Sequence, residues 1–206
     1  MLTASQRNLL VAAVFALWAV GLAAMGTRIQ PEFFKPFSLV TAALGAGLAF
    51  FNQSAWKWRV WRGWLVRRPN IAGTWIADLR PTGGRPPLTG FMVVRQTLTS
   101  LSLRLLTAEA SSVSLASSIV HEPDGARALA SVYRSDPRLE VRDRSPIHNG
   151  ALYLTVSGGS LNELVGHYWT DRASAGELRL HGRQNRLLNT FTEAQTAFSS
   201  VGASTK

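Results

Sequence analysis

The fold is decided by two alternating runs within residues 101–120, which read LSLRLLTAEASSVSLASSIV. In the first run Leu101, Leu103 and Leu105 alternate with Ser102 and Arg104, the period of a strand with one buried face. The second run covers residues 112–120, and only a few residues separate it from the first. The pattern therefore predicts two strands that are joined by a short turn.

The same period continues on both sides of this pair, from Pro69 onwards. Six of the seven connections between the predicted strands are short, and residues 136–147 are the exception. Such strands predict an eight-stranded, antiparallel, up-and-down barrel of the lipocalin-like kind over residues 69–183, because closure removes exposed sheet edges. A two-sheet sandwich is the alternative. The predicted strands are 70–80, 89–98, 100–107, 112–120, 127–135, 148–157, 161–170 and 176–183.

The first third of the chain is apolar. Residues 8–27 and 36–56 carry no charge, and each run is long enough to cross about 30 Å of hydrocarbon as a helix. We therefore expect a two-helix transmembrane hairpin over residues 1–56, as a membrane segment in front of an all-β domain. A signal peptide and a buried soluble hairpin are the alternatives.

Basic residues and tryptophans alternate after the second apolar run, in residues 57–68. This composition is typical of a segment that faces lipid headgroups. Since the cations follow the second run and Arg7 precedes the first, both termini and the barrel are expected to be cytoplasmic. The tail, residues 184–206, is expected to be disordered or to form a short docking helix. The segment's residues are Lys57, Arg59, Arg62, Arg67 and Arg68, with Trp58, Trp61 and Trp64, and Trp56 directly before them.

Charge and composition exclude several classes of function. The net charge is +10, but residues 1–68 hold eight basic residues against one acid, a net charge of +7. The nearly neutral remainder disfavours DNA or RNA as a partner, because phosphate binding needs the excess on the folded domain. Without cysteine, disulfides, thiolate metal sites and cysteine nucleophiles are excluded. We find no catalytic or metal-ligand motif and expect neither an enzyme nor a cofactor.

Polar side chains share the inward parity of the predicted strands, where each unsatisfied polar group costs roughly 1–3 kcal/mol. An eight-stranded barrel is wide enough for one small ligand. The set therefore predicts an anionic, hydrogen-bonding ligand, although each member taken singly also fits a satisfied core group or a strand end. The candidate binding residues are Gln96, Thr107, Ser112, Ser114, Tyr133, His148, Tyr168, Thr170 and Arg172.

Several short segments follow one another behind the apolar hairpin: Gly73-Thr74-Trp75, Gln96-Thr97, Thr107 with Ser112 and Ser114, Tyr133 with Pro137, His148-Asn149-Gly150, and Gly166 to Arg172. Their order resembles the two-transmembrane, β-barrel effectors of bacterial cyclic-oligonucleotide anti-phage (CBASS) signalling. The resemblance covers residues 9–183. The sequence departs from this pattern at Ser131, where another aromatic residue is expected.

This resemblance implies that the barrel binds a cyclic dinucleotide made by a partner nucleotidyltransferase. It also implies ligand-driven homo-oligomerisation and disruption of the bacterial inner membrane, where the chain would be a two-pass protein bound to the lipid bilayer. Arg172 would pair with a phosphate, hydroxyl groups would donate to the ligand, and Tyr133 or Tyr168 would stack on a base. Trp75 is expected to plug the barrel floor, and His148 either donates to the ligand or caps its strand.

Two other functions fit part of the pattern. A membrane-tethered, lipocalin-like carrier of a lipid or other apolar molecule would need an apolar cavity, which conflicts with the inward Gln96, Thr170 and Arg172. A structural scaffold would fill the barrel with its own side chains.

Overall fold

The computed structural model describes residues 16, 18–20, 24, 34–61, 64–123, 125–156 and 162–203. The chain divides into two compact units, residues 1–51 and 52–206. In the first unit, helix α2 begins at Phe34 and continues to Gln53, across the boundary between the units. The second unit contains the barrel and a C-terminal helix.

The predicted two-helix transmembrane hairpin is wrong. Among the residues that the structure describes, no helix is both long enough and apolar enough to span a membrane. The first predicted span lies almost wholly outside the described residues. α2 replaces the second span, but it ends three residues early, at Gln53. Its last turn carries the polar residues Asn52 and Gln53.

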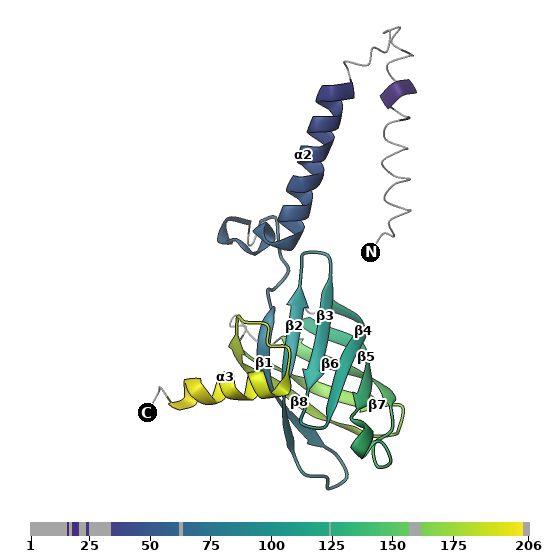
Figure 1. The fold of residues 1–206 in the computed structure, drawn as a ribbon, viewed down its shortest axis with the longest axis vertical. Coiled ribbons are helices and arrows are strands. Elements are labelled where there is room, and N and C mark those ends of the chain that lie inside the picture. Colours follow the sequence, from purple (N-terminus) through teal and green to yellow (C-terminus); the bar gives the residue numbers. More distant parts are fainter. Residues whose placement is uncertain are drawn as a thin grey trace. The chain divides into compact units, whose positions relative to one another are not determined.

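Eight antiparallel strands form a closed barrel in sequence order, with β8 pairing back to β1 (Figure 1). The barrel predicted from the alternating pattern is confirmed, since each strand pairs with its neighbour in the chain. The strands are β1 (Gly73–Pro81), β2 (Leu88–Gln96), β3 (Leu101–Leu106), β4 (Ala110–His121), β5 (Arg127–Pro137), β6 (His148–Val156), β7 (Leu164–Thr170) and β8 (Ala175–Gln184).

The connections β1–β2, β3–β4, β5–β6 and β7–β8 lie at one end of the barrel, which we call the mouth. The opposite end, which we call the base, holds the β2–β3 and β4–β5 turns and the start of β1. Between the two ends the barrel is filled by the inward side chains that the alternation predicted. This core includes Ile71, Trp75, Met92, Leu129, Leu154, Leu164, Leu178 and Leu180, all nearly or fully buried.

Trp75 closes the base. Its side chain is fully buried, and its Nε1 donates a hydrogen bond of 2.9 Å to the carbonyl oxygen of Ile71. The Arg183 guanidinium lies 5.7 Å from the centre of the indole ring and donates to the carbonyl oxygens of Ala72 and Asn70. The base is therefore sealed by packing and hydrogen bonds.

The segment before β1 contacts the β2–β3 turn at the base. Two 3-10 turns, Ala55–Lys57 and Arg59–Trp61, follow α2. Asn52 accepts hydrogen bonds from the backbone of Leu98 and from the backbone and hydroxyl of Thr99. The Arg68 guanidinium donates to the Leu98 carbonyl oxygen, and its partial burial holds the Arg68 pKa below the ordinary value.

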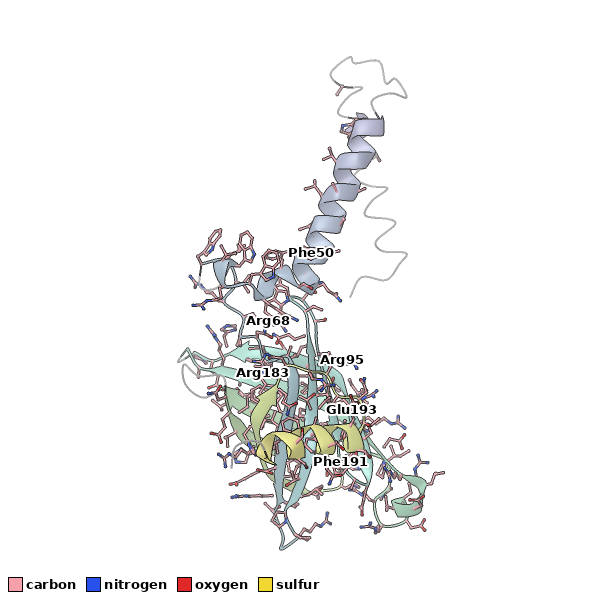
Figure 2. The ribbon with its side chains drawn as sticks, turned by 60° about the vertical axis from the view of Figure 1, so that its left-hand side comes forward. Phe50, Arg68, Arg95, Arg183, Phe191 and Glu193 are labelled. Carbon is pink, nitrogen blue, oxygen red and sulfur yellow. The ribbon has the colours of Figure 1, made fainter. Side chains whose placement is uncertain are left out.

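Of the two alternatives for the tail, the structure has the docking helix: α3, Phe191–Ala203 (Figure 2). α3 begins there because the Thr190 hydroxyl accepts a hydrogen bond of 3.2 Å from the Glu193 backbone N–H. Phe191 and Phe198 pack against Phe91 of β2, with ring centroids 5.5 and 5.4 Å away. The apolar side chains of α3 therefore pack against an outward residue of β2.

Candidate functional site

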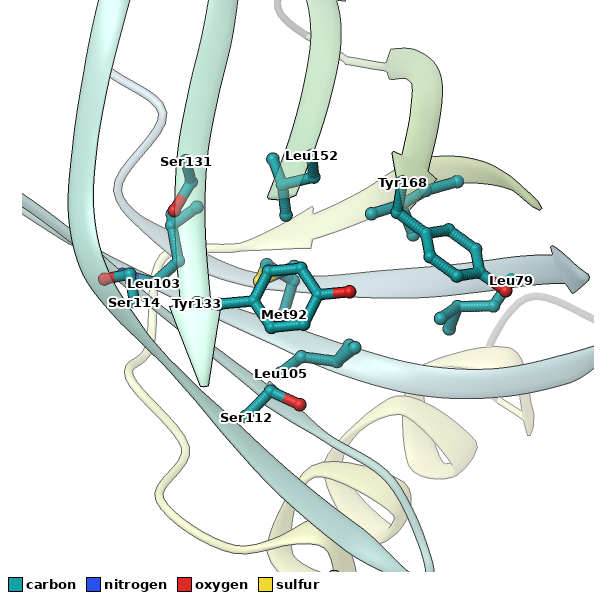
Figure 3. A pocket seen from close by; sticks show the side chains of 11 residues that line it. Leu79, Met92, Leu103, Leu105, Ser112, Ser114, Ser131, Tyr133, Leu152 and Tyr168 are labelled. Atoms are coloured by element: carbon teal, nitrogen blue, oxygen red, sulfur yellow. The ribbon is translucent and has the colours of Figure 1, made fainter. Parts of the chain in front are cut away.

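A large pocket occupies the barrel mouth and is lined from all four connections at that end. It encloses about 940 Å³, solvent at its opening included. Below it lies a smaller, mainly apolar pocket of about 340 Å³ (Figure 3). The two share Tyr133 and Tyr168, so these tyrosines lie where the polar mouth meets the apolar core.

The mouth brings together seven of the nine predicted binding residues. They come from β4 to β7 and from the β3–β4 and β7–β8 connections, and they meet because strands of matching inward parity converge on one end of the barrel. The seven are Thr107, Ser112, Tyr133, His148, Tyr168, Thr170 and Arg172.

Each tyrosine packs over a glycine on the neighbouring strand. Tyr133 pairs with Gly150, and a Cβ added at Gly150 would lie 2.5 Å from the Tyr133 ring and hydroxyl. Tyr168 pairs with Gly176, where an added Cβ would lie 2.7 Å from its ring. The missing side chains leave room for both rings to lie flat across the sheet, which fixes their orientation before any ligand arrives.

Gly150→Ala is therefore expected to displace the Tyr133 ring and to lower the free energy of unfolding by about 1–3 kcal/mol, the usual cost of overpacking. The added methyl group would also lie 2.7 Å from the Trp169 carbonyl oxygen, a backbone atom with little freedom to move. Urea unfolding measures the loss. Gly45→Ala is the matched control, since an added Cβ there meets nothing within 4 Å. Equal stability of the two variants would contradict the packing.

Partial burial raises the pKa of Tyr133 to about 12, with smaller contributions from Tyr168 and Asp171, while Arg172 lowers it. Burial also raises the pKa of Tyr168, and Arg85 opposes that shift. Both phenols are therefore protonated at neutral pH and available to donate hydrogen bonds to an anion.

The raised pKa of Tyr133 predicts a loss of stability at high pH. Above the ordinary tyrosine pKa of about 10 the unfolded chain releases this proton, whereas the folded chain keeps it up to about pH 12. The unfolded state then binds fewer protons, so stability present below pH 10 is lost as pH rises towards 12. Urea unfolding of wild type and Tyr133→Phe between pH 9 and 12 should show a smaller loss for the variant. Parallel curves would contradict this role of Tyr133.

Arg172 lies in the β7–β8 turn, which Thr170 organises. The Thr170 hydroxyl lies 2.6 Å from the Ser174 hydroxyl and accepts hydrogen bonds from the backbone N–H groups of Arg172 and Ser174. These bonds fix the backbone of the turn, while the exposed guanidinium of Arg172 lines the mouth. Thr170 therefore positions Arg172.

Arg85 is a second cation at the mouth, and the sequence reasoning missed it. It lies in the β1–β2 connection after Gly83 and Gly84. Neither Arg85 nor Arg172 forms a salt bridge with an acid of the described chain, whereas Glu109 at the same mouth is paired with Arg144 at 2.6 Å. The mouth therefore has a net positive charge, which suits an anionic ligand. The sequence did offer one indication of Arg85, namely its position. The β1–β2 connection, which carries Arg85, lies at the same end of the barrel as the β7–β8 turn, which carries Arg172.

Several hydroxyl groups near the pocket are already satisfied within the barrel. The Ser114 hydroxyl accepts a hydrogen bond of 2.9 Å from the Leu103 backbone N–H beside a β-bulge, and Ser114 lines only the inner pocket. Ser131 donates to the Ala116 carbonyl oxygen at 3.0 Å. The Thr107 hydroxyl bonds to the backbone of Ala110 within the β3–β4 turn. Of these three, only Thr107 lines the mouth.

The structure does not place Gln96 with the other candidates. Its amide lies at the base, where Oε1 accepts from the Ile71 backbone N–H and Nε2 donates to the Pro69 carbonyl oxygen, both at 2.8 Å. Gln96 therefore ties the segment before β1 to the end of β2. Parity did not separate Gln96 from the residues at the mouth, because it fixes the face of a strand and not the end.

The long β5–β6 connection, residues 138–147, lines one side of the mouth through Val141 and Ser145. It contains the 3-10 turn Leu139–Val141, and Arg142 holds it by a 2.7 Å salt bridge to Asp136. His148, which follows it, has Nδ1 3.0 Å from the Pro146 carbonyl oxygen and leaves the rest of its ring at the pocket.

The family model of the Cap15 cyclic dinucleotide receptor domain matches residues 66–182. The chain belongs to this family. It is also similar to the CD-NTase-associated protein 15 of Staphylococcus schleiferi, with 30% identity over 131 residues, 63% of this chain and 69% of that protein. The Cap15 match covers β1 to β7 and most of β8, and it ends before α3.

Membership in the Cap15 family agrees with the chemistry of the mouth. Guanidinium groups, hydroxyl donors and aromatic rings are the groups that recognise phosphates and bases. The family is one of cyclic dinucleotide receptor domains. Within the described residues, no group of three or more histidine or acidic side chains is placed to hold a metal ion.

Proposed function

We propose that this chain is an effector of CBASS anti-phage signalling whose barrel binds a cyclic dinucleotide at the mouth. The observation that carries this proposal is the meeting of three kinds of group in one pocket of a Cap15 receptor domain: two arginines without acidic partners among the described residues, two glycine-backed tyrosines and several hydroxyl groups. The ligand would come from a partner nucleotidyltransferase, as the name of the staphylococcal relative suggests.

In this proposal, Arg172 and Arg85 each pair with one of the ligand's two phosphates. A guanidinium binds a phosphate through two parallel hydrogen bonds, and both side chains are free of competing acids in the described chain. Tyr133 and Tyr168 stack on the bases or donate from their protonated hydroxyls, while His148 and Ser112 line the walls. The apolar inner pocket below them excludes water from the deeper part of the site.

The proposal places the active protein at the bacterial inner membrane, where ligand-driven homo-oligomerisation disrupts the bilayer. It does not include a two-pass topology. Supporting observations are the exposed Trp58, Val60, Trp64 and Leu65, which alternate with cations in the segment before the barrel. Tryptophan beside lysine or arginine is typical of chains that contact anionic headgroups.

Calorimetric titration of the 206-residue chain with a panel of cyclic dinucleotides tests the ligand assignment. We expect saturable binding of at least one member, and much weaker binding of the linear dinucleotide with the same bases, because a ring presents both phosphates in a fixed geometry. A fatty acid serves as the comparison ligand for the apolar-carrier alternative. Binding of the fatty acid, with no response to any cyclic dinucleotide, would overturn the proposal.

A further inference from the structure

One outer face of the barrel, formed by β4 to β7, carries exposed apolar side chains. Val132 of β5 is 48% exposed, Trp169 of β7 is 50% exposed and Leu115 of β4 is 66% exposed. On the outer side of β2 the comparable residues Phe91 and Val93 are buried by the tail and α3. The chain therefore covers one outer face with its own helix, whereas the β4–β7 face is not covered by any of the residues that the structure describes.

Strand register orders this face into rows that cross the strands. Val132 of β5 pairs with Ala151 of β6, which pairs with Trp169 of β7. In the next row towards the mouth, Arg134 of β5 pairs with Asn149 of β6, and Asn149 is joined to Asp171. The Asn149 backbone N–H donates to the Asp171 carboxylate at 2.9 Å, and its carbonyl oxygen accepts from the Asp171 N–H at 3.0 Å.

The two rows are self-complementary about β6. On one side of β6 stand Val132 and the exposed cation Arg134, and on the other stand Trp169 and the exposed anion Asp171. The centre of the apolar row is the small residue Ala151, which permits close approach. Arg134 has no salt bridge among the described residues. A two-fold axis along β6 would set Arg134 of one copy against Asp171 of another, and Val132 against Trp169.

We propose that this face binds a second copy of the chain through such a two-fold contact, in which both barrel mouths point the same way. The contact deepens the proposed function, because it gives the ligand-driven assembly a surface. An unlike partner protein would need its own matching pattern, whereas here both halves of an isologous contact are present on one barrel. Charge complementarity fixes the register, and the apolar row supplies the buried area.

The face is coupled to the mouth by the alternation of the strands. Tyr133 lies between Val132 and Arg134 in β5, and Tyr168 directly precedes Trp169 in β7. Inward residues that would contact the ligand thus alternate with outward residues that would contact the second copy. The ladders of β6 already join β5 to β7, and a ligand held between Tyr133 and Tyr168 would add contacts to the two strands that carry both halves of the contact. Assembly should therefore be stronger when the mouth is occupied.

Trp169→Asp tests the apolar row, with Val165→Asp as its matched control. Both are outward apolar residues of β7, but Val165 pairs with Thr155, outside the two rows. In analytical ultracentrifugation with saturating cyclic dinucleotide, wild type and Val165→Asp should exceed the monomer mass of 22.4 kDa. Trp169→Asp should need at least tenfold more protein to reach the same average mass. Equal assembly of all three proteins would overturn the proposal.

Charge reversal tests the two-fold arrangement itself. Arg134→Asp alone should face Asp171 of its partner with like charge, and Asp171→Arg alone should face Arg134, so each variant should assemble poorly. An equimolar mixture should recover, because both ionic contacts between the two unlike copies then join opposite charges. No recovery in the mixture, with both variants folded and binding ligand, would contradict this axis.

The calorimetric titration distinguishes failure of the proposed interface from failure of the proposed receptor function. If wild type binds a cyclic dinucleotide and remains at 22.4 kDa at every protein concentration, the interface is overturned and the receptor assignment stands. If wild type binds no cyclic dinucleotide but assembles through Trp169, the receptor assignment and the ligand dependence fail, while the contact surface stands.

Discussion

Arg172→Ala should weaken the binding of a cyclic dinucleotide by about 10–100-fold. A hydrogen bond to a charged group contributes roughly 1.5–3 kcal/mol, and each 1.4 kcal/mol corresponds to a factor of ten in affinity. The Arg172 guanidinium lines the mouth without an acidic partner in the described chain, and the backbone of its turn is held by Thr170. Truncation should therefore remove a ligand contact and leave the turn intact. Calorimetric titration measures the change in dissociation constant.

Arg104→Ala is the matched control, because Arg104 is an exposed arginine on the outward side of β3. It removes the same net charge from the barrel without touching the mouth, so it should change the affinity less than twofold. Arg85→Ala should weaken binding in the same direction as Arg172→Ala, since the proposal gives each arginine one phosphate. An affinity of Arg172→Ala equal to that of Arg104→Ala would remove Arg172 from the site.

Trp75→Ala is expected to lower the free energy of unfolding by about 3–5 kcal/mol, the usual cost of removing a buried tryptophan. The indole is fully buried, packs beneath Arg183 and donates a hydrogen bond to the Ile71 carbonyl oxygen. The variant would lose this packing and open a cavity at the base. Urea unfolding followed by circular dichroism measures the loss.

Trp75→Phe separates packing from hydrogen bonding in the same experiment. It keeps an aromatic ring at the base but leaves the Ile71 carbonyl oxygen without its 2.9 Å partner, so its cost should be smaller, about 1–3 kcal/mol. A loss below 1 kcal/mol for Trp75→Ala would show that Trp75 does not seal the base.

The barrel could be predicted from the sequence because the pattern that specifies each strand lies within that strand. Alternation such as Leu101, Leu103 and Leu105 against Ser102 and Arg104 fixes which face of a strand is buried. Short connections then leave few ways to pair the strands. The same parity placed Tyr133, Tyr168 and Arg172 on the inner side, and the structure brings them to one pocket.

The positions of Gln96 and Arg85 could not be predicted, because they depend on contacts between residues that are distant in the sequence. Gln96 has inward parity, yet its partners Pro69 and Ile71 hold it at the base. Arg85 stands in a connection without a strand pattern, so only the shape of the mouth assigns it to the pocket. The transmembrane prediction was wrong because it counted runs without charges by their length alone, and no helix of the described residues is long enough and apolar enough to span a membrane.

The position of a bound cyclic dinucleotide tests the central claim most directly. A crystal structure of the chain with the best ligand of the calorimetric panel should show the ligand at the mouth, in contact with the rings of Tyr133 and Tyr168. It should also show a phosphate within hydrogen-bonding distance of the Arg172 guanidinium. A ligand seated elsewhere, such as the base beside Gln96 and Arg68, would contradict the assignment of the mouth as the receptor site.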